Sequence, residues 1–168
     1  MCGIVGYIGD KKVVPILIDG LKRLEYRGYD SAGLAVLEQG RIVVHRSVGK
    51  IKELESAVWG ANLTGTVGLG HTRWATHGRP TEENAHPHTD CTGDLVVVHN
   101  GIIENYLALK EKLIAEGHVF RSETDTGVIA HLIEKYLKED PDIERATRRA
   151  LNDLTGAYAI GVLWNGDP

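Results

Sequence analysis

Short apolar runs along this chain predict the strands of a globular fold. Such runs lie at residues 2–8, 33–38, 41–47, 66–72, 94–99 and 157–164. Gln39-Gly40 separates the second run from the third, which predicts a hairpin. The run at 2–8 predicts a buried strand. The run at 94–99 lacks polar alternation, so we expect both of its faces to be buried.

Longer stretches with helical spacing of apolar residues lie between these runs. Helices are predicted at about residues 12–25, 50–58, 103–116, 124–139 and 142–153. In the first of them, Val13, Val14, Leu17, Leu21 and Leu24 form one apolar face. Thr124 is the expected N-cap of the fourth helix.

The order of these elements indicates an α+β fold. Strands occur early, in the middle and at the end of the chain, and helices are grouped between them without a regular alternation. This order favours antiparallel sheet covered by helices in a single domain. Residues 73–93 lack a periodic pattern, and loops of this length within a domain are usually functional.

Composition excludes several classes of protein. The chain has 168 residues and a net charge of −4, without a basic tract, so nucleic acid is not an expected partner. No apolar run reaches the ~20 residues that span a bilayer, and a signal-peptide pattern is missing, so we expect no membrane association. Two cysteines are too few for a disulfide framework, and a reducing cytoplasmic location fits them.

Cys2 is the most informative candidate for chemistry. A small second residue normally allows removal of the initiator methionine, which would place a thiol and a free α-amino group on Cys2. An α-amino group has a pKa of about 7.7–8.0 and a free thiol one of about 8.5, so the amine can accept the thiol proton. Cys2 would then be a nucleophile that carries its own base. The structural alternative is a small residue at the start of a buried strand.

Residues 71–78 and 98–101 supply further candidates. Arg73 can hold a carboxylate through paired hydrogen bonds, and Trp74 can wall a small site. An ordinary surface loop explains the same residues. Asn100 and Gly101 follow a buried strand, where a side-chain amide and a backbone N–H can stabilise an oxyanion. Asn-Gly is also a common β-turn pair, so a simple turn is the alternative.

Two other polar segments allow a binding role as well as a structural one. Asp125 lies in the segment 122–126, where it can bind an ammonium group or simply cap a helix. The segment 86–91 contains His86, His88, Asp90 and Cys91, which suggests zinc. Pro87 and the lack of a second ligand cluster in the sequence argue against that hypothesis. No phosphate-binding glycine motif occurs, so a nucleotide ligand is not indicated.

Taken together, the motifs resemble those of one family. They are Met-Cys-Gly-Ile-Val-Gly-Tyr at 1–7, Leu-Glu-Tyr-Arg-Gly-Tyr-Asp-Ser-Ala-Gly at 24–33, Gly-His-Thr-Arg-Trp-Ala-Thr-His-Gly at 70–78, Glu-Asn-Ala-His-Pro-His at 83–88, His-Asn-Gly-Ile-Ile-Glu-Asn-Tyr at 99–106 and Ser-Glu-Thr-Asp-Thr at 122–126. Their order resembles that of class II glutamine amidotransferase domains, which are N-terminal-nucleophile hydrolases. Within that family the chain is similar to the glutaminase domain of glucosamine-6-phosphate synthases. The resemblance covers essentially all 168 residues.

The resemblance implies a four-layer αββα sandwich and a role for each matching residue. Cys2 would attack the amide carbon of L-glutamine, and Asn100 and Gly101 would stabilise the oxyanion. Arg73 would bind the α-carboxylate of glutamine and Asp125 its α-ammonium. The other implied residues are Trp74, Thr76 and His77, which would border the pocket, and Arg27, which would support the nucleophile. No metal and no organic cofactor is implied for this half-reaction.

The family comparison also implies what the chain lacks. We expect residues 1–168 to be the N-terminal portion of a glutaminase domain, with the sandwich incomplete at the C-terminus and the sugar-isomerase domain absent. Ammonia would pass to a sugar-isomerase domain or subunit, which makes glucosamine 6-phosphate from fructose 6-phosphate. Exposed sheet edges would favour a homodimer. The alternatives are a non-catalytic fragment, a glutamine-binding subunit, or the glutaminase domain of an amidophosphoribosyltransferase.

Overall fold

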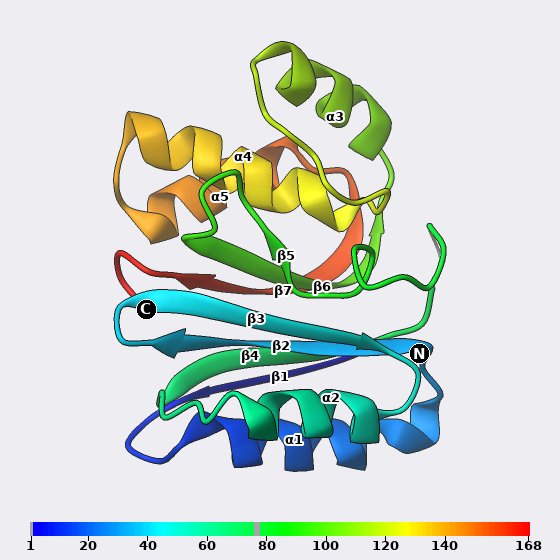
Figure 1. Ribbon diagram of the computed structural model, residues 1–168. Helices are drawn as coiled ribbons and strands as arrows, with labels where there is room; N and C mark the ends of the chain where they lie inside the picture. Colours follow the sequence, from blue (N-terminus) through cyan, green and yellow to red (C-terminus); the bar gives the residue numbers. More distant parts are fainter. Residues whose placement is uncertain (1, 76–77) are drawn as a thin grey trace.

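Two antiparallel sheets stack face to face, and helices cover the outer face of each (Figure 1). The computed structural model describes residues 2–75 and 78–168. The first sheet has the order β1-β4-β2-β3 and consists of β1 (Gly3–Ile8), β2 (Ser31–Glu38), β3 (Arg41–Val48) and β4 (Val67–Arg73). The second has the order β5-β6-β7 and consists of β5 (His88–Thr89), β6 (Leu95–Ile103) and β7 (Gly156–Trp164). The predicted αββα sandwich is confirmed.

The helices divide between the two sheets. The first sheet is covered by α1 (Val13–Arg23) and α2 (Ile51–Gly60), and a short 3-10 helix, η1 (Glu25–Arg27), follows α1 (Figure 1). The second sheet is covered by α3 (Tyr106–Ala115), α4 (Thr126–Glu139) and α5 (Ile143–Asp153) (Figure 1). None of the described helices is long and apolar enough to cross a membrane.

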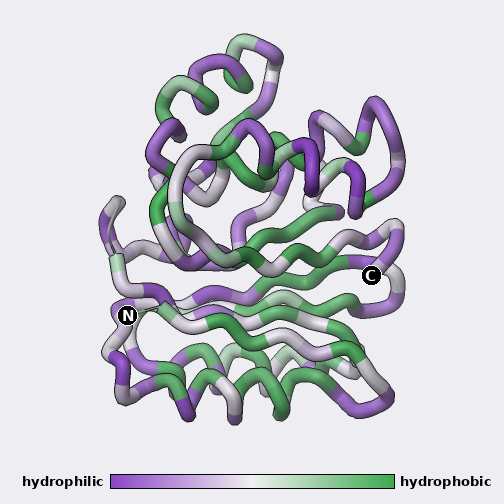
Figure 2. The backbone as a smooth tube through the Cα atoms, turned by 180° about the vertical axis from the view of Figure 1, so that it is seen from behind, coloured by the Kyte–Doolittle hydropathy of each residue, from purple (hydrophilic) through white to green (hydrophobic). Residues whose placement is uncertain are grey.

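Three hydrophobic clusters hold the four layers together. Figure 2 shows hydrophobic colour along the stacked strands and alternating colour along the helices. One outer cluster joins Leu17 and Leu21 of α1 to Leu34 of β2. The other lies between the second sheet and α4. Ala35, Val96 and Leu163 form a smaller cluster between the sheets, so each sheet buries side chains on both faces.

Most predicted elements are confirmed, and the differences have local causes. Strand β6 does not end before Asn100-Gly101: both residues pair with β7, opposite Ala159 and Tyr158, so the β-turn alternative is wrong. The following helix therefore begins only at Tyr106. Strand β1 is not fully buried, because it lies at the edge of its sheet and Ile8 is 67% exposed.

The expected N-cap of α4 is also wrong. Asp125 occupies the N-cap position, and its side chain does not cap the helix. The hydroxyl of Thr124 instead lies 3.1 Å from Nε2 of His88, which belongs to the second sheet. Thr124 thus ties the start of α4 to β5 rather than to its own helix.

Candidate active site

A pocket of about 480 Å³ lies where the start of β1 and the ends of β4 and β6 meet the start of α4. It is lined by Cys2, Arg27, Arg73, Trp74, His86, His99, Asn100, Gly101, Ile102, Thr124, Asp125 and Thr126. The pairing of Gly3 with Thr72 brings Cys2 beside Arg73 and Trp74, which are 71 and 72 positions away along the chain. The structure therefore brings together every described residue that the sequence predicts for the site. Thr76 and His77 lie outside the described residues.

Backbone groups of Trp74 hold the thiol of Cys2. The N–H of Trp74 donates to Sγ of Cys2 at 3.2 Å, and the thiol lies 3.6 Å from the carbonyl oxygen of Trp74. The carboxylate of Asp30 fixes this segment, because it accepts the N–H of Ala75 at 2.5 Å. These contacts fix the position of the Cys2 sulfur at the edge of the pocket.

The side-chain amide of Asn100 is turned toward Cys2. Its Nδ2 donates to the carbonyl oxygen of Cys2 at 3.4 Å. Its Oδ1 lies 2.8 Å from Nε2 of His71, which also lies 3.0 Å from the carbonyl oxygen of His99. Both partners of His71 Nε2 are acceptors, so this nitrogen carries the proton. His71 thereby sets which end of the Asn100 amide faces the nucleophile.

His71 is suited to this task because it stays neutral. Its ring is fully buried, and burial lowers its pKa to about 4. Nδ1 of the ring is buried and has no hydrogen-bond partner among the described residues, which fits an unprotonated nitrogen. His71 is not among the site residues predicted from the sequence, although it lies in the motif at 70–78 that contains Arg73.

Gly101 holds a conformation that other residues rarely adopt. Its φ is +122°, and a Cβ atom at this position would overlap the carbonyl oxygen of Ala157 on β7. Because β6 passes this point without a side chain, the backbone at Gly101 borders the pocket directly.

Arg73 and Asp125 give the pocket one cation and one anion. Both residues are 4% exposed. The guanidinium of Arg73 donates to the carbonyl oxygens of Gly78 and Arg79, each at 3.3 Å. The carboxylate of Asp125 accepts the N–H of Ile103 at 2.9 Å. Two opposite charges in fixed positions suit an amino acid zwitterion.

Arg27 and Trp74 lie at the more open part of the pocket. Arg27 is exposed at the end of η1, and Trp74 is 54% exposed. The ring of Trp74 lies against Gly28, where an added Cβ would come within 3.1 Å of it. Both residues line the pocket, although neither is enclosed by it.

Four buried histidines lie together beside the pocket, and two of them, His86 and His99, line it. This pocket histidine cluster consists of His71, His86, His88 and His99. The rings of His71 and His86 stack with centroids 4.0 Å apart. The pKa values of His86 and His88 lie well below the ordinary histidine value, mainly because both rings are buried.

The pocket histidine cluster anchors the residues on either side of Asp125. The hydroxyl of Thr126 lies 2.9 Å from Nδ1 of His99 and 3.1 Å from Nε2 of His86. Thr124 contacts His88 in the same way. Consecutive side chains at 124–126 therefore all have partners in the second sheet or the adjoining loop. The segment therefore holds Asp125 in place, which differs from the helix-capping role considered from the sequence.

The zinc set suggested by residues 86–91 does not assemble. His86 and His88 belong to the pocket histidine cluster. The carboxylate of Asp90 accepts the hydroxyl of Thr92 at 2.7 Å and the N–H of Gly93 at 2.7 Å. Cys91 lies near other residues, described below.

The comparisons with known proteins identify the class of this chain. The family model described as "Glutamine amidotransferase domain" matches residues 55–166. The chain belongs to this family of enzymes, which confirms the class inferred from the motifs.

Particular relatives narrow the comparison. The whole chain aligns with the glutamine–fructose-6-phosphate aminotransferase (isomerizing) of Pyrococcus horikoshii at 57% identity and with that of Aquifex aeolicus at 56%. It spans 28% of the length of each of these relatives. Among solved structures, the glutamine phosphoribosylpyrophosphate amidotransferase of B. subtilis matches 98% of this chain with a TM-score of 0.83 and 28% identity, over 35% of its own chain.

Proposed function

We propose that this domain hydrolyses L-glutamine to glutamate and ammonia, with Cys2 as the nucleophile. The observation that carries the proposal is the position of the Cys2 thiol in a pocket with the Asn100 amide turned toward it by His71. The family and the relatives at 57% and 56% identity support the same reaction class. The 28% identity to the phosphoribosylpyrophosphate amidotransferase makes that branch the weaker alternative.

The proposed reaction begins with proton transfer within Cys2. Once Met1 is removed, the α-amino group takes the thiol proton, and the thiolate attacks the amide carbon of glutamine. The N–H of Trp74 holds the sulfur in place before attack. Arg73 holds the α-carboxylate of glutamine and Asp125 its α-ammonium, which presents the side-chain amide to Cys2. Trp74, Thr76 and His77 border the bound substrate, and Arg27 supports the nucleophile region.

Asn100 and Gly101 act when the amide carbonyl becomes an oxyanion. Nδ2 of Asn100 and the backbone N–H of Gly101 donate to the negative oxygen of the tetrahedral intermediate. The carbon–nitrogen bond then breaks, and the α-ammonium group of Cys2 protonates the leaving ammonia. Water attacks the resulting thioester, restores the thiol and releases glutamate. The proposed steps use protein groups of the pocket and one water molecule.

The measurement that tests this proposal is glutamate release from L-glutamine. The purified protein is compared with Cys2→Ala and Cys91→Ser variants, and mass spectrometry establishes whether Met1 is removed. We expect turnover in the wild type and in Cys91→Ser, whose thiol lies outside the pocket, and none in Cys2→Ala. No turnover in a correctly processed wild-type chain would favour a non-catalytic, glutamine-binding domain.

We further propose that the ammonia passes to a sugar-isomerase unit that converts fructose 6-phosphate to glucosamine 6-phosphate. The names of the two relatives, of which this chain spans 28%, support this acceptor. Glucosamine 6-phosphate formed from glutamine and fructose 6-phosphate by the longer protein would support it. Glutamate release without amino sugar formation would favour another acceptor. A cytoplasmic location and homodimer formation stay predictions.

A further inference from the structure

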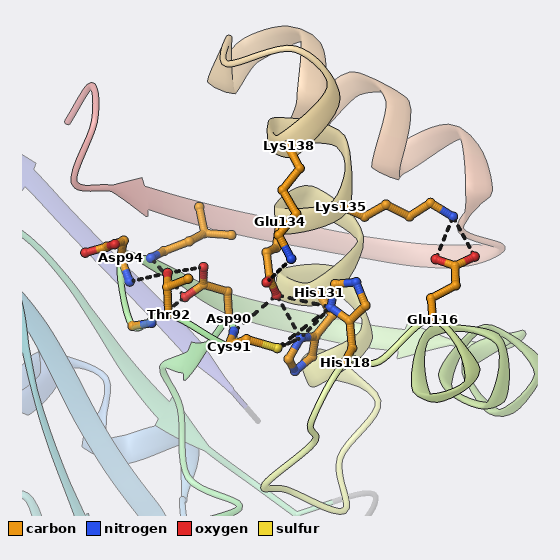
Figure 3. Close-up of polar contacts among 12 residues, drawn as sticks. Asp90, Cys91, Thr92, Asp94, Glu116, His118, His131, Glu134, Lys135 and Lys138 are labelled. Carbon is orange, nitrogen blue, oxygen red and sulfur yellow. Dashed lines mark hydrogen bonds and ion pairs between the residues drawn. The ribbon is translucent and has the colours of Figure 1, made fainter.

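A second group of chemically reactive side chains lies outside the pocket. Cys91, His118, His131 and Glu134, here called the Cys91 cluster, point toward one another from three segments of the chain (Figure 3). Cys91 follows β5, His118 follows α3, and His131 and Glu134 lie one turn apart on α4. One ligand atom from each residue lies within 4.8 Å of every other.

Five of the six ligand-atom distances within the Cys91 cluster are close to the edges of a metal-coordination tetrahedron. Nδ1 of His118, Nδ1 of His131 and Oε2 of Glu134 lie 3.1–3.2 Å from one another. Sγ of Cys91 lies 3.5 Å from Nδ1 of His131 and 3.9 Å from Nδ1 of His118. Around a tetrahedral zinc ion, these edges are about 3.4 Å between nitrogen or oxygen ligands and about 3.6 Å between sulfur and nitrogen.

Hydrogen bonds alone do not account for this arrangement. The three atoms Nδ1, Nδ1 and Oε2 make three mutual contacts, but two neutral rings offer at most one proton each. If both Nδ1 atoms carry protons, both protons point at Oε2. No proton is then left for the contact between the two Nδ1 atoms. If only one does, a lone pair of the other faces the carboxylate. A cation among the three atoms would satisfy all of them.

The surroundings suit a metal as well. Oε1 of Glu134 accepts a hydrogen bond from Lys138 at 2.8 Å, and Oε2 faces the cluster, where it also accepts the backbone N–H of Cys91 at 3.1 Å (Figure 3). Lys138 thus orients the carboxylate as groups around metal ligands commonly do. The two histidines and Glu134 are buried, whereas Cys91 is exposed and provides access from solvent. A thiolate and a carboxylate would balance the charge of a divalent ion.

We propose that the Cys91 cluster binds a zinc ion in a structural site. Thiolate, imidazole and carboxylate ligands in a four-coordinate set are those that zinc prefers. The ion would join the loop after β5, the segment after α3 and the middle of α4. The segment after α3 leads to Thr124 and Asp125, so the ion would also stabilise one wall of the pocket. The proposal does not depend on the reaction at Cys2.

The first test is the zinc content of the purified protein after dialysis against metal-free buffer. We expect about one zinc ion per chain in the wild type and less than about a tenth of that in Cys91→Ser and His131→Gln. Cys2→Ser is the matched control, because it removes the other thiol and leaves the Cys91 cluster intact. It should keep its zinc. A wild-type protein without zinc that also fails to take up added zinc would overturn the proposal.

The second test identifies the thiolate ligand by replacing zinc with cobalt(II) in the wild-type protein and in two cysteine variants. Cobalt(II) added to metal-free protein should give the near-ultraviolet charge-transfer band of a thiolate–cobalt bond together with the visible bands of tetrahedral cobalt. Both should persist in Cys2→Ser, and the thiolate band should disappear in Cys91→Ser. A band that disappears in Cys2→Ser and persists in Cys91→Ser would place the metal at the nucleophile, and the proposal would fail.

Discussion

The pocket histidine cluster and the Cys91 cluster contain the same type of residue in two different chemical situations. In the first, the rings contact hydroxyl groups, carbonyl oxygens and an amide, so donors meet acceptors. In the second, two ring nitrogens and a carboxylate oxygen crowd together with a thiol nearby. The difference shows that the partners of a histidine, rather than its burial, distinguish a structural network from a set of metal ligands.

The two clusters also support different parts of the molecule. The pocket histidine cluster joins β4 and β6 to the start of α4 and directs Asn100 toward Cys2. The Cys91 cluster brings together α4, the loop after β5 and the segment after α3. Loss of the first should therefore change catalysis, whereas loss of the second should change metal content and stability.

His71→Leu should give the largest effect and is the direct test of the first cluster. Removing one oxyanion donor costs about 10²–10³ in kcat, so losing only the orientation of Asn100 should cost about 10–100-fold. The KM for glutamine should stay within about twofold, because Arg73 and Asp125 are unchanged. Steady-state glutaminase kinetics measure both constants.

Two variants sharpen this prediction. His71→Gln retains an N–H donor and should recover part of the lost kcat. His45→Gln changes a histidine of β3 that does not line the pocket, and it should leave both constants unchanged. A fall in kcat of the same size in His71→Leu and His71→Gln would show that His71 does not act through Asn100.

The stability of the domain should decrease between pH 6.5 and pH 4. The pKa of His71 is about 4 in the folded protein and about 6.5 in the unfolded chain, so the unfolded chain binds more protons in this window. The contribution of neutral His71 to the free energy of unfolding is therefore fully present above the pKa of the unfolded chain. It is lost as the pH falls toward the pKa of the folded protein. Protonation of His71 in the unfolded chain should lower the free energy of unfolding by about 2 kcal/mol at pH 5. Protonation of His86 and His88 should lower it further.

Urea unfolding at pH 7, 6 and 5 measures this loss. The Cys91→Ser background is preferable, because metal release at low pH would otherwise act in the same direction. The pH dependence should be shallower when His71→Gln is added. Equal unfolding free energies at pH 7 and pH 5 would contradict the prediction.

The sequence predicts elements and local motifs well, because both depend on neighbours along the chain. The sequence predicts the α-helices α1 to α5 of the described residues but not the 3-10 helix η1, and Arg73, Asn100 and Asp125 stand out within short motifs. The extension of β6 past Asn100 was not predictable in this way, since it depends on pairing with β7.

Contacts between distant segments explain what the sequence did not predict. His71 and Asn100 are 29 positions apart, and Cys91 and His131 are 40 positions apart. The zinc hypothesis included Cys91 but grouped it with His86 and His88, because a sequence motif reveals only residues that are close along the chain. The fold instead places His86 in the wall of the pocket and His88 against Thr124, and it brings Cys91 to α4.

Lys138→Met should give the smallest effect and test how the Cys91 cluster holds its carboxylate. The ammonium of Lys138 is mostly exposed, so solvent screens its ion pair with the buried Glu134 and the pair should add less to the stability of the metal-free protein than to zinc binding. If Glu134 is a metal ligand, however, losing the group that orients it should weaken zinc binding about tenfold, or about 1.4 kcal/mol. Lys135→Met is the matched control, because Lys135 lies on the same helix and pairs with Glu116 instead. Competition with a zinc-binding dye measures both affinities, and equal values for the two variants would show that Lys138 does not act on the metal site.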